Sequence, residues 1–110
     1  MKVTYLGHSC FLIEIKEKRL LFDPFISGNP LAKDIIDLES IKTDYVLISH
    51  GHGDHCMDAE KIIRDNKAFI ISNNEIIEIF YNFLTNELVN NLIRSVAFAE
   101  EQKIGSLNFI

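Results

Sequence analysis

Three of the chain's four histidines lie between residues 50 and 55, together with one carboxylate. They follow a short apolar, β-branched run that ends in turn residues, which is typical of a buried strand that opens into a loop. Because side chains alternate in an extended backbone, His50 and His52 point the same way and can hold one ion. Asp54 and His55 follow a glycine, which lets the backbone bend so that they can face a second position. Imidazole nitrogen and carboxylate oxygen together are typical ligands of zinc, iron or manganese, so the segment predicts a transition-metal site.

The composition of the chain limits the class of protein. Its 110 residues are enough for one small domain, and 47% hydrophobic with 25% charged residues is typical of a soluble globular protein. A net charge of −5 without a basic run predicts no nucleic-acid and no membrane partner, and no stretch approaches the ~18 apolar residues of a membrane span. The chain starts directly with a strand pattern and has two cysteines, which fits a cytoplasmic protein.

Alternating apolar and polar residues at the start of the chain predict a three-stranded antiparallel meander. The expected strands cover residues 2–6, 10–16 and 19–22, with a charged hairpin turn at residues 17–18. Strands and helices mix in the rest of the chain. We expect helices over 31–39, from 58 to 64 or 65, and over 74–84 with a continuation toward 93, and strands over 45–48, 68–71 and 104–110.

Local signals suggest how these elements begin and which faces they bury. Asp58 is a candidate cap for its helix, and the residues from Ser72 to Glu75 have capping-box spacing. The apolar stripe of the helix that follows is expected to be core. The inward face of the sheet is expected to carry Phe11, Ile13, Val46 and Ile48.

The motif His-x-His-x-Asp-His at residues 50–55 resembles the signature of the metallo-β-lactamase fold superfamily. The segments VTYLGHS (residues 3–9) and LFDPF (residues 21–25) narrow the resemblance to the lactonase-like branch of metal-dependent hydrolases, similar to ascorbate-6-phosphate lactonase. The resemblance runs from residue 1 to about residue 80. It implies an α/β fold, the αββα metallo-β-lactamase-type sandwich, of which residues 1–110 supply about the N-terminal half as a mostly antiparallel sheet with outer helices.

The resemblance also implies a role for each residue of the motif. His50 and His52 hold one metal ion, and Asp54 and His55 help to hold a second, so a complete site takes up to two Zn²⁺ or Mn²⁺ ions. Asp54 and His55 are then also the candidate catalytic residues. A water molecule activated by the metal attacks a small-molecule substrate, which is expected to be an ester, a lactone or a phosphoester.

Four residues near the motif or at strand ends can be interpreted in two ways. His8 either lies near the metal site, as the resemblance implies, or is a turn histidine bonded to nearby backbone. Asp23 either orients a metal-bound imidazole or simply ends a strand before a proline. Cys56 follows the motif directly, and thiolate binds zinc well, but the family cluster uses no cysteine there, so we expect a packed neighbour. Cys10 is expected to be a buried strand residue.

The ligand set in the chain is incomplete by the standard of the resemblance. Members of the superfamily repeat the sheet-and-helix unit, and the second unit supplies another histidine to each metal site and a bridging aspartate. No histidine follows His55 here. Three functions therefore remain open: a metal-dependent hydrolase, a truncated non-catalytic half-domain that forms a homodimer or pairs with another chain, and a plain metal-binding protein. The remaining ligands can come from a second chain, as in a homodimer, or from a missing C-terminal half.

Overall fold

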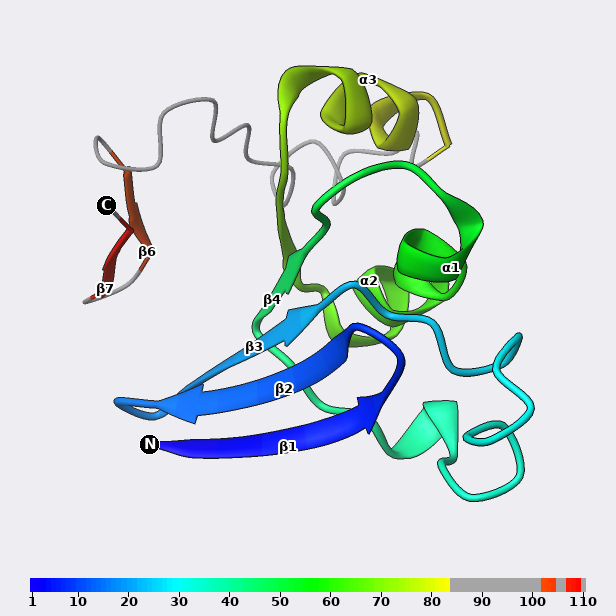
Figure 1. Cartoon of the computed structure of the whole chain (residues 1–110). Helices are drawn as coiled ribbons and strands as arrows, with labels where there is room; N and C mark the ends of the chain where they lie inside the picture. The colour runs from blue at the N-terminus through cyan, green and yellow to red at the C-terminus, as the bar shows by residue number, and fades with distance from the viewer. Residues whose placement is uncertain (84–101, 105–106, 110) are drawn as a thin grey trace.

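The structure is a computed structural model that describes residues 1–83, 102–104 and 107–109 (Figure 1). Within these residues, five strands form one mixed sheet in the order β1-β2-β3-β4-β5. The first three strands pair antiparallel, which confirms the predicted meander, and β4 and β5 add to it in parallel. The strands are β1 (Lys2–Gly7), β2 (Cys10–Ile15), β3 (Lys18–Phe22), β4 (Tyr45–Leu47) and β5 (Phe69–Ile71).

The hairpin between β2 and β3 turns one residue earlier than predicted. Lys16 and Glu17 have φ angles of 50° and 63°. Two successive left-handed residues form the type of two-residue turn that matches the twist of an antiparallel pair. This turn sets Ile15 opposite Lys18, so β2 ends and β3 begins one residue earlier than predicted, while the other ends of both strands agree with the prediction.

The helix predicted over residues 31–39 is wrong. Turns replace it, and only a short 3-10 helix, η1 (Leu38–Ser40), forms at its end. The Asn29 side chain accepts a hydrogen bond from the Leu31 N–H, and the Asp37 side chain accepts one from the Glu39 N–H. Such local side-chain bonds offer the backbone an alternative to the regular helical ladder.

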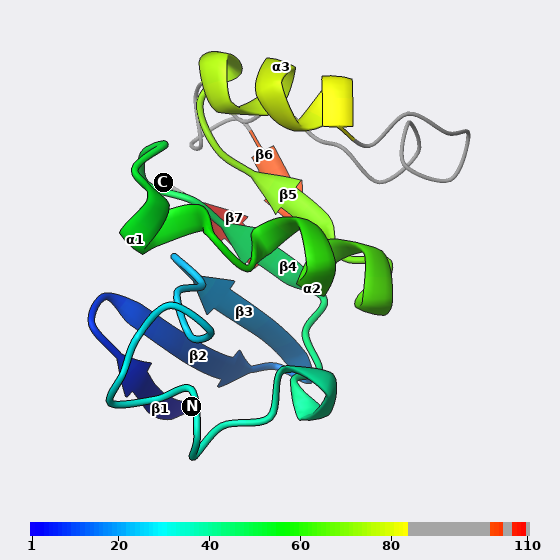
Figure 2. The same cartoon turned by 90° about the vertical axis from the view of Figure 1, so that its right-hand side faces the viewer.

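Three α-helices lie in the described part of the chain: α1 (Gly53–Cys56), α2 (Ala59–Asn66) and α3 (Asn74–Phe83). The helices α2 and α3 agree with the predicted ranges, but the predicted continuation of α3 toward 93 lies outside the described residues. The helix α1 was not predicted. It is only four residues long and overlaps the end of the histidine motif. The helix α2 lies against β4 on one face of the sheet (Figure 2).

Both predicted caps differ from the structure. Asp58 precedes α2, but its side chain makes no capping bond and instead accepts hydrogen bonds from the N–H groups of Ile26 (2.6 Å) and Ser27 (2.9 Å). In α3 the cap is Asn73, whose Oδ1 accepts a hydrogen bond from the Ile76 N–H. The predicted cap, Ser72, donates to the Ile48 carbonyl 24 residues earlier. Tertiary donors thus occupy Asp58, whereas in α3 the local cap moves by one residue, to Asn73, while Ser72 bonds a tertiary acceptor.

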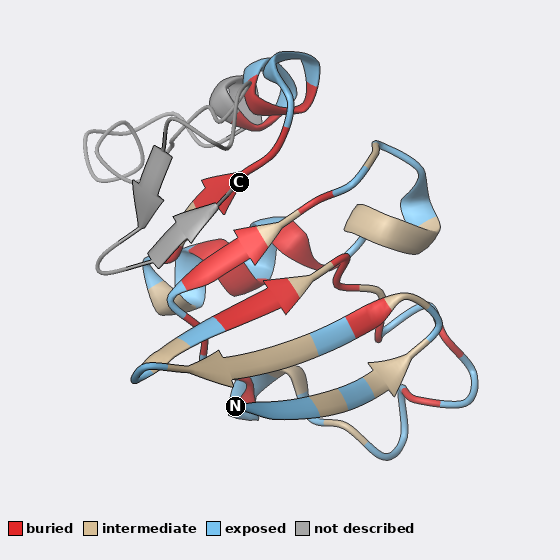
Figure 3. Cartoon of the chain, turned by 60° about the vertical axis from the view of Figure 1, so that its left-hand side comes forward, coloured by how far each residue is buried: buried red, intermediate tan, exposed pale blue. Residues whose placement is uncertain are grey.

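The apolar stripe of α3 is core, as predicted. Ile76, Ile77 and Phe80 are buried in the same cluster as Val46 of β4 and Ile63 of α2. This cluster fills the space between the helices and one face of the sheet. Burial rises across the sheet from β1 to β5 (Figure 3).

The prediction that Phe11, Ile13, Val46 and Ile48 share one sheet face is wrong. Ile13 is paired across the strands with Leu20, and Leu20 with Tyr45, so these three side chains share a face. Val46 follows Tyr45 and therefore points to the opposite face, toward the helices. Phe11 is 37% exposed.

The second face of the sheet is also apolar. We call it the apolar sheet face; it carries Ile13, Ile15, Leu20, Phe22, Tyr45, Leu47, Phe69 and Ile71. The register extends this face to Val3 and Tyr5, which are 53% and 61% exposed, on the edge strand β1.

The predicted strand over 104–110 is instead two short strands, β6 (Gln102–Ile104) and β7 (Leu107–Phe109), which pair antiparallel as a separate two-stranded sheet. Among the described residues, none of the helices is both long enough and apolar enough to cross a bilayer.

Candidate metal centre

The sheet topology brings three segments that are distant in the sequence to the same end of the strands. Because β1 and β3 are each antiparallel to β2, and β4 is parallel to β3, the strands β1, β3 and β4 all run the same way. Their carboxyl ends therefore meet. His8 follows β1, Asp23 follows β3, and the histidine motif follows β4. The carboxyl edge of parallel strands is a common place for ligand sites in α/β proteins.

The side chains at this edge form two overlapping groups of metal-ligating atoms. His50, His52 and Asp54 make one group, and His8, Asp54 and His55 make the other. Within each group, one ligand atom from every residue lies within 4.8 Å of the others, and Asp54 belongs to both. The structure therefore brings together all four residues predicted as metal ligands, with His8 beside them.

Asp23 fixes the start of the motif. Its carboxylate accepts hydrogen bonds from the N–H and the Oγ–H of Ser49, both at 2.7 Å. The Ser49 Oγ also lies 2.9 Å from Nδ1 of His50. Because the single hydroxyl proton of Ser49 is donated to Asp23, Nδ1–H of His50 must be the donor to Ser49. This tautomer leaves Nε2 of His50 with a free lone pair, which is the state required of a metal ligand.

Asp23 also lies beside His55. Nδ1 of His55 is 3.1 Å from Oδ2 of Asp23, but it is buried and makes no hydrogen bond of regular geometry to any described residue. At this distance a small rotation of the ring would complete the bond. Nε2 of the same ring faces Asp54, 3.8 Å from Oδ1. A ring held at Nδ1 by a carboxylate and open at Nε2 is the usual arrangement of a metal-bound histidine, so the donor set fits a metal ion.

His8 contacts the shared carboxylate directly. Nε2 of His8 lies 3.0 Å from Oδ2 of Asp54. Partial desolvation raises the pKa of Asp54, but the hydrogen bond with His8 and the charges of His55 and His8 together outweigh it, so the pKa lies below its usual value. Asp54 is therefore ionised at neutral pH, as a metal ligand must be. The interpretation of His8 as a histidine bonded only to nearby backbone does not match this contact across 46 residues.

The two cysteines stand apart from both groups of ligand atoms. Cys56 donates a weak hydrogen bond from Sγ to the Gly51 carbonyl at 3.6 Å, and burial, with the nearby charges of Asp23 and Asp54, raises its pKa. Cys10 is fully buried in the core, which raises its pKa to about 11 and confirms it as a buried strand residue. A thiol with a raised pKa is a poor ligand before a metal arrives. Ser49 is the residue that the sequence analysis missed; its only signal is its place next to His50.

Comparisons with known proteins agree with this geometry. Residues 2–105 match the family model described as "Beta-lactamase superfamily domain". A UPF0173 metal-dependent hydrolase of Flavobacterium johnsoniae is 47% identical over 76 residues, which cover 69% of this chain and 33% of the relative. The relative from Carboxydothermus hydrogenoformans is 45% identical over 89 residues, 81% of this chain and 37% of its own length.

A solved structure is similar as well. Igni18, described as a novel metallo hydrolase from the archaeon Ignicoccus hospitalis, superposes with a TM-score of 0.64 at 34% identity, covering 87% of this chain and 38% of that one. The chain thus spans about a third of the length of the relatives it matches. The predicted superfamily and α/β fold are confirmed, and the chain belongs to the β-lactamase superfamily.

Proposed function

We propose that the chain supplies the first part of a metal-dependent hydrolase, in which the cluster centred on Asp54 holds the metal. The observation that carries the proposal is the pair of ligand groups that share this carboxylate. The relatives named above are described as metal-dependent hydrolases or as a metallo hydrolase. The alternative of a non-catalytic half-domain has less support, because the similar proteins are described as hydrolases.

The residues of the chain have separate tasks in this proposal. His50 and His52 hold one ion, and Asp54 and His55 help to hold a second, with His8 hydrogen-bonded to Asp54 in the second group. Zn²⁺ or Mn²⁺ suits these ligands. When bound, such an ion lowers the pKa of a water molecule and polarises a carbonyl or phosphoryl oxygen.

The remaining steps belong to the protein. Asp23 and Ser49 hold the rings of His55 and His50 in the orientation and tautomer that the ligand role needs. Asp54, ionised at neutral pH, can accept a proton at either carboxylate oxygen, and the hydrogen bond from His8 holds it in place. The substrate is a small ester, lactone or phosphoester, as in the lactonase-like branch that the sequence resembles.

The test of this function is turnover by the 110-residue chain. We expect slow, metal-dependent hydrolysis of an ester, a lactone or a phosphodiester, at least about a hundredfold below the ~10 s⁻¹ of a typical complete enzyme. Asp54→Asn should remove the metal-dependent part, whereas the exposed Asp34→Asn should not change it. The proposal fails if no substrate is turned over above the rate of Asp54→Asn. Fast turnover by a monomer would show instead that the chain already holds a complete site.

The proposed hydrolase needs more ligands than the chain has, since no histidine follows His55. We propose that a second polypeptide segment supplies them, either the missing C-terminal half or a second copy in a homodimer. The edge of the apolar sheet face supports this proposal, because Val3 and Tyr5 on β1 are 53% and 61% exposed, and exposed apolar surface can mark an interaction site. The middle of this face, at Leu20, Tyr45 and Ile71, is buried.

Light scattering coupled to size exclusion tests whether the chain associates with itself. The chain has a mass of 12.6 kDa, and we expect a dimer or a larger species with and without zinc. Charges on the exposed edge of the apolar sheet face, in Val3→Lys/Tyr5→Lys, should shift the population toward monomer, whereas Ile79→Lys on α3 should not. A compact monomer with a cooperative thermal transition would contradict the self-association.

A further inference from the structure

A hollow of about 310 Å³ opens beside the metal centre, between the end of β1 and the loop 29–36. Its lining is largely apolar and includes Tyr5, Leu6, Leu31, Ala32, Ile35 and Ile36. This volume lies at the small end of the range for ligand pockets. We call it the His8 hollow, because His8 is also part of its wall.

Apolar side chains in this wall are unusually exposed. Leu31 is 83% exposed and Ile35 is 82% exposed, the highest values among the large apolar side chains of the described residues apart from Met1. Neither contributes to the core beneath the loop, which is built by Ala32 and Ile36. A single exposed apolar side chain is common in soluble proteins. Leu31 and Ile35 together, on the rim of one hollow, form a surface that an apolar ligand can cover.

The loop that carries these side chains is fixed. Asn29 is buried, and its backbone carbonyl accepts hydrogen bonds from the N–H groups of Ala32 and Lys33. Gly7 has a φ of 104°, and a Cβ at this position would lie 2.7 Å from Nδ2 of Asn29. The loop therefore packs against the end of β1 at a distance that only glycine permits, and the hollow is preformed.

His8 joins the hollow to the metal centre. It lines the hollow, and its Nε2 lies 3.0 Å from Oδ2 of Asp54, which belongs to both groups of ligand atoms. A molecule whose polar end reaches Asp54 can therefore place its other end against Leu31 and Ile35.

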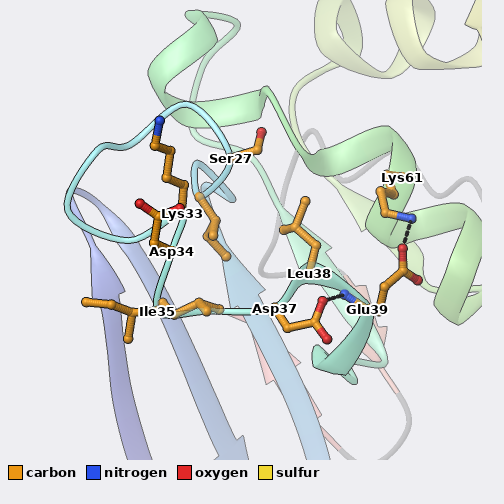
Figure 4. A pocket seen from close by; sticks show the side chains of 10 residues that line it. Ser27, Lys33, Asp34, Ile35, Asp37, Leu38, Glu39 and Lys61 are labelled. Atoms are coloured by element: carbon orange, nitrogen blue, oxygen red, sulfur yellow. Dashed lines mark hydrogen bonds and ion pairs between the residues drawn. The ribbon is translucent and has the colours of Figure 1, made fainter.

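A second hollow, on the other side of the same loop, does not have this property. It is lined by Lys33, Asp34, Glu39 and Lys61 among others (Figure 4). Lys61 is paired with Glu39 at 2.7 Å, and none of its lining residues belongs to the ligand groups. This hollow shares Ile35 and Ile36 with the His8 hollow, but charged side chains form much of its wall and none of its lining residues gives access to the metal centre.

We propose that the His8 hollow binds a short aliphatic group of the substrate, with Leu31 and Ile35 as the residues that set specificity. The inference rests on the proposed hydrolase function, which places the reacting group of the substrate at the metal centre. The substrate class is then an ester or lactone with an aliphatic acyl chain, rather than a compact polar phosphoester.

Straight-chain carboxylates test the proposal, because their head group suits the metal and their tail length can be varied. Acetate, butanoate and hexanoate are titrated into the zinc-loaded chain, and affinity is measured from amide shifts in ¹⁵N spectra. We expect hexanoate to bind about tenfold tighter than acetate, since burying each methylene strengthens binding up to about fourfold. In Leu31→Ala/Ile35→Ala the ratio should fall to about twofold, while Ile79→Ala, at an exposed apolar residue outside the hollow, should keep it.

Hexanol added to the metal-free chain separates this inference from the proposed function. The hollow is supported if the amides of Gly7, Ala32 and Ile36 shift, even where zinc does not bind and the metal proposal fails. Equal affinities for acetate and hexanoate in the zinc-loaded chain would overturn the inference. So would hexanol shifts confined to Tyr45 and Leu47 on the apolar sheet face, or a tenfold ratio that survives in Leu31→Ala/Ile35→Ala.

Discussion

The variant His50→Ala/His52→Ala is expected to bind zinc at least about a hundredfold more weakly than the unchanged chain, because it loses two of the three donors in one ligand group. The remaining donor of that group, Asp54, is 46% exposed and cannot hold the ion alone. The second group of ligand atoms, around His55, is unchanged in this variant and should bind zinc only weakly. Zinc content after dialysis, measured by elemental analysis, and calorimetric titration give the two readouts.

The control for this experiment is Lys33→Ala/Asp34→Ala, which removes two exposed charged side chains from the loop outside the ligand groups. Its zinc affinity should equal that of the unchanged chain. An unchanged zinc content in His50→Ala/His52→Ala would show that the motif does not hold the metal.

The variant Asp58→Ala is expected to lower the free energy of unfolding by about 3 kcal/mol. The Asp58 carboxylate is 5% exposed and accepts hydrogen bonds from the N–H groups of Ile26 and Ser27 and from the Ser27 hydroxyl. Removing this acceptor leaves donors without partners inside the fold. A loss of this size is a large part of the total stability of a small domain.

Urea unfolding followed by circular dichroism measures this loss. Asp58→Asn keeps one acceptor oxygen and should cost about half as much. Asp65→Ala, which removes an exposed carboxylate on α2, should stay within about 0.5 kcal/mol of the unchanged chain. If Asp58→Ala is no less stable than Asp65→Ala, the carboxylate is not what ties the loop to α2.

The sequence predicts those parts of the fold that depend on local periodicity. The meander, α2 and α3 follow from side-chain alternation and helical spacing, which are properties of neighbouring residues. The motif at 50–55 is recognisable for the same reason. The helix predicted over 31–39 fails where the side chains of Asn29 and Asp37 accept hydrogen bonds from the N–H groups of Leu31 and Glu39.

The parts that the sequence does not predict depend on topology. The role of Asp58 is set by donors in Ile26 and Ser27, which no local pattern connects to it. His8 has two interpretations in the sequence because its distance from Asp54 follows only from β1 and β4 running the same way. The face that Val46 occupies depends in the same way on the register between strands.

Two residues at the metal centre have a left-handed backbone, so selection for stability and selection for metal binding favour different residues there. His8 and Asp23 have φ angles of 52° and 45°, although neither is glycine, and each such residue costs about 1 kcal/mol or more. Selection for thermal stability alone would favour glycine or asparagine at both positions. Glycine would remove the contacts of His8 with Asp54 and of Asp23 with Ser49, and asparagine would weaken them. In a lineage that keeps the metal, these two strained residues should therefore persist, and in one that has lost it they should be among the first to drift.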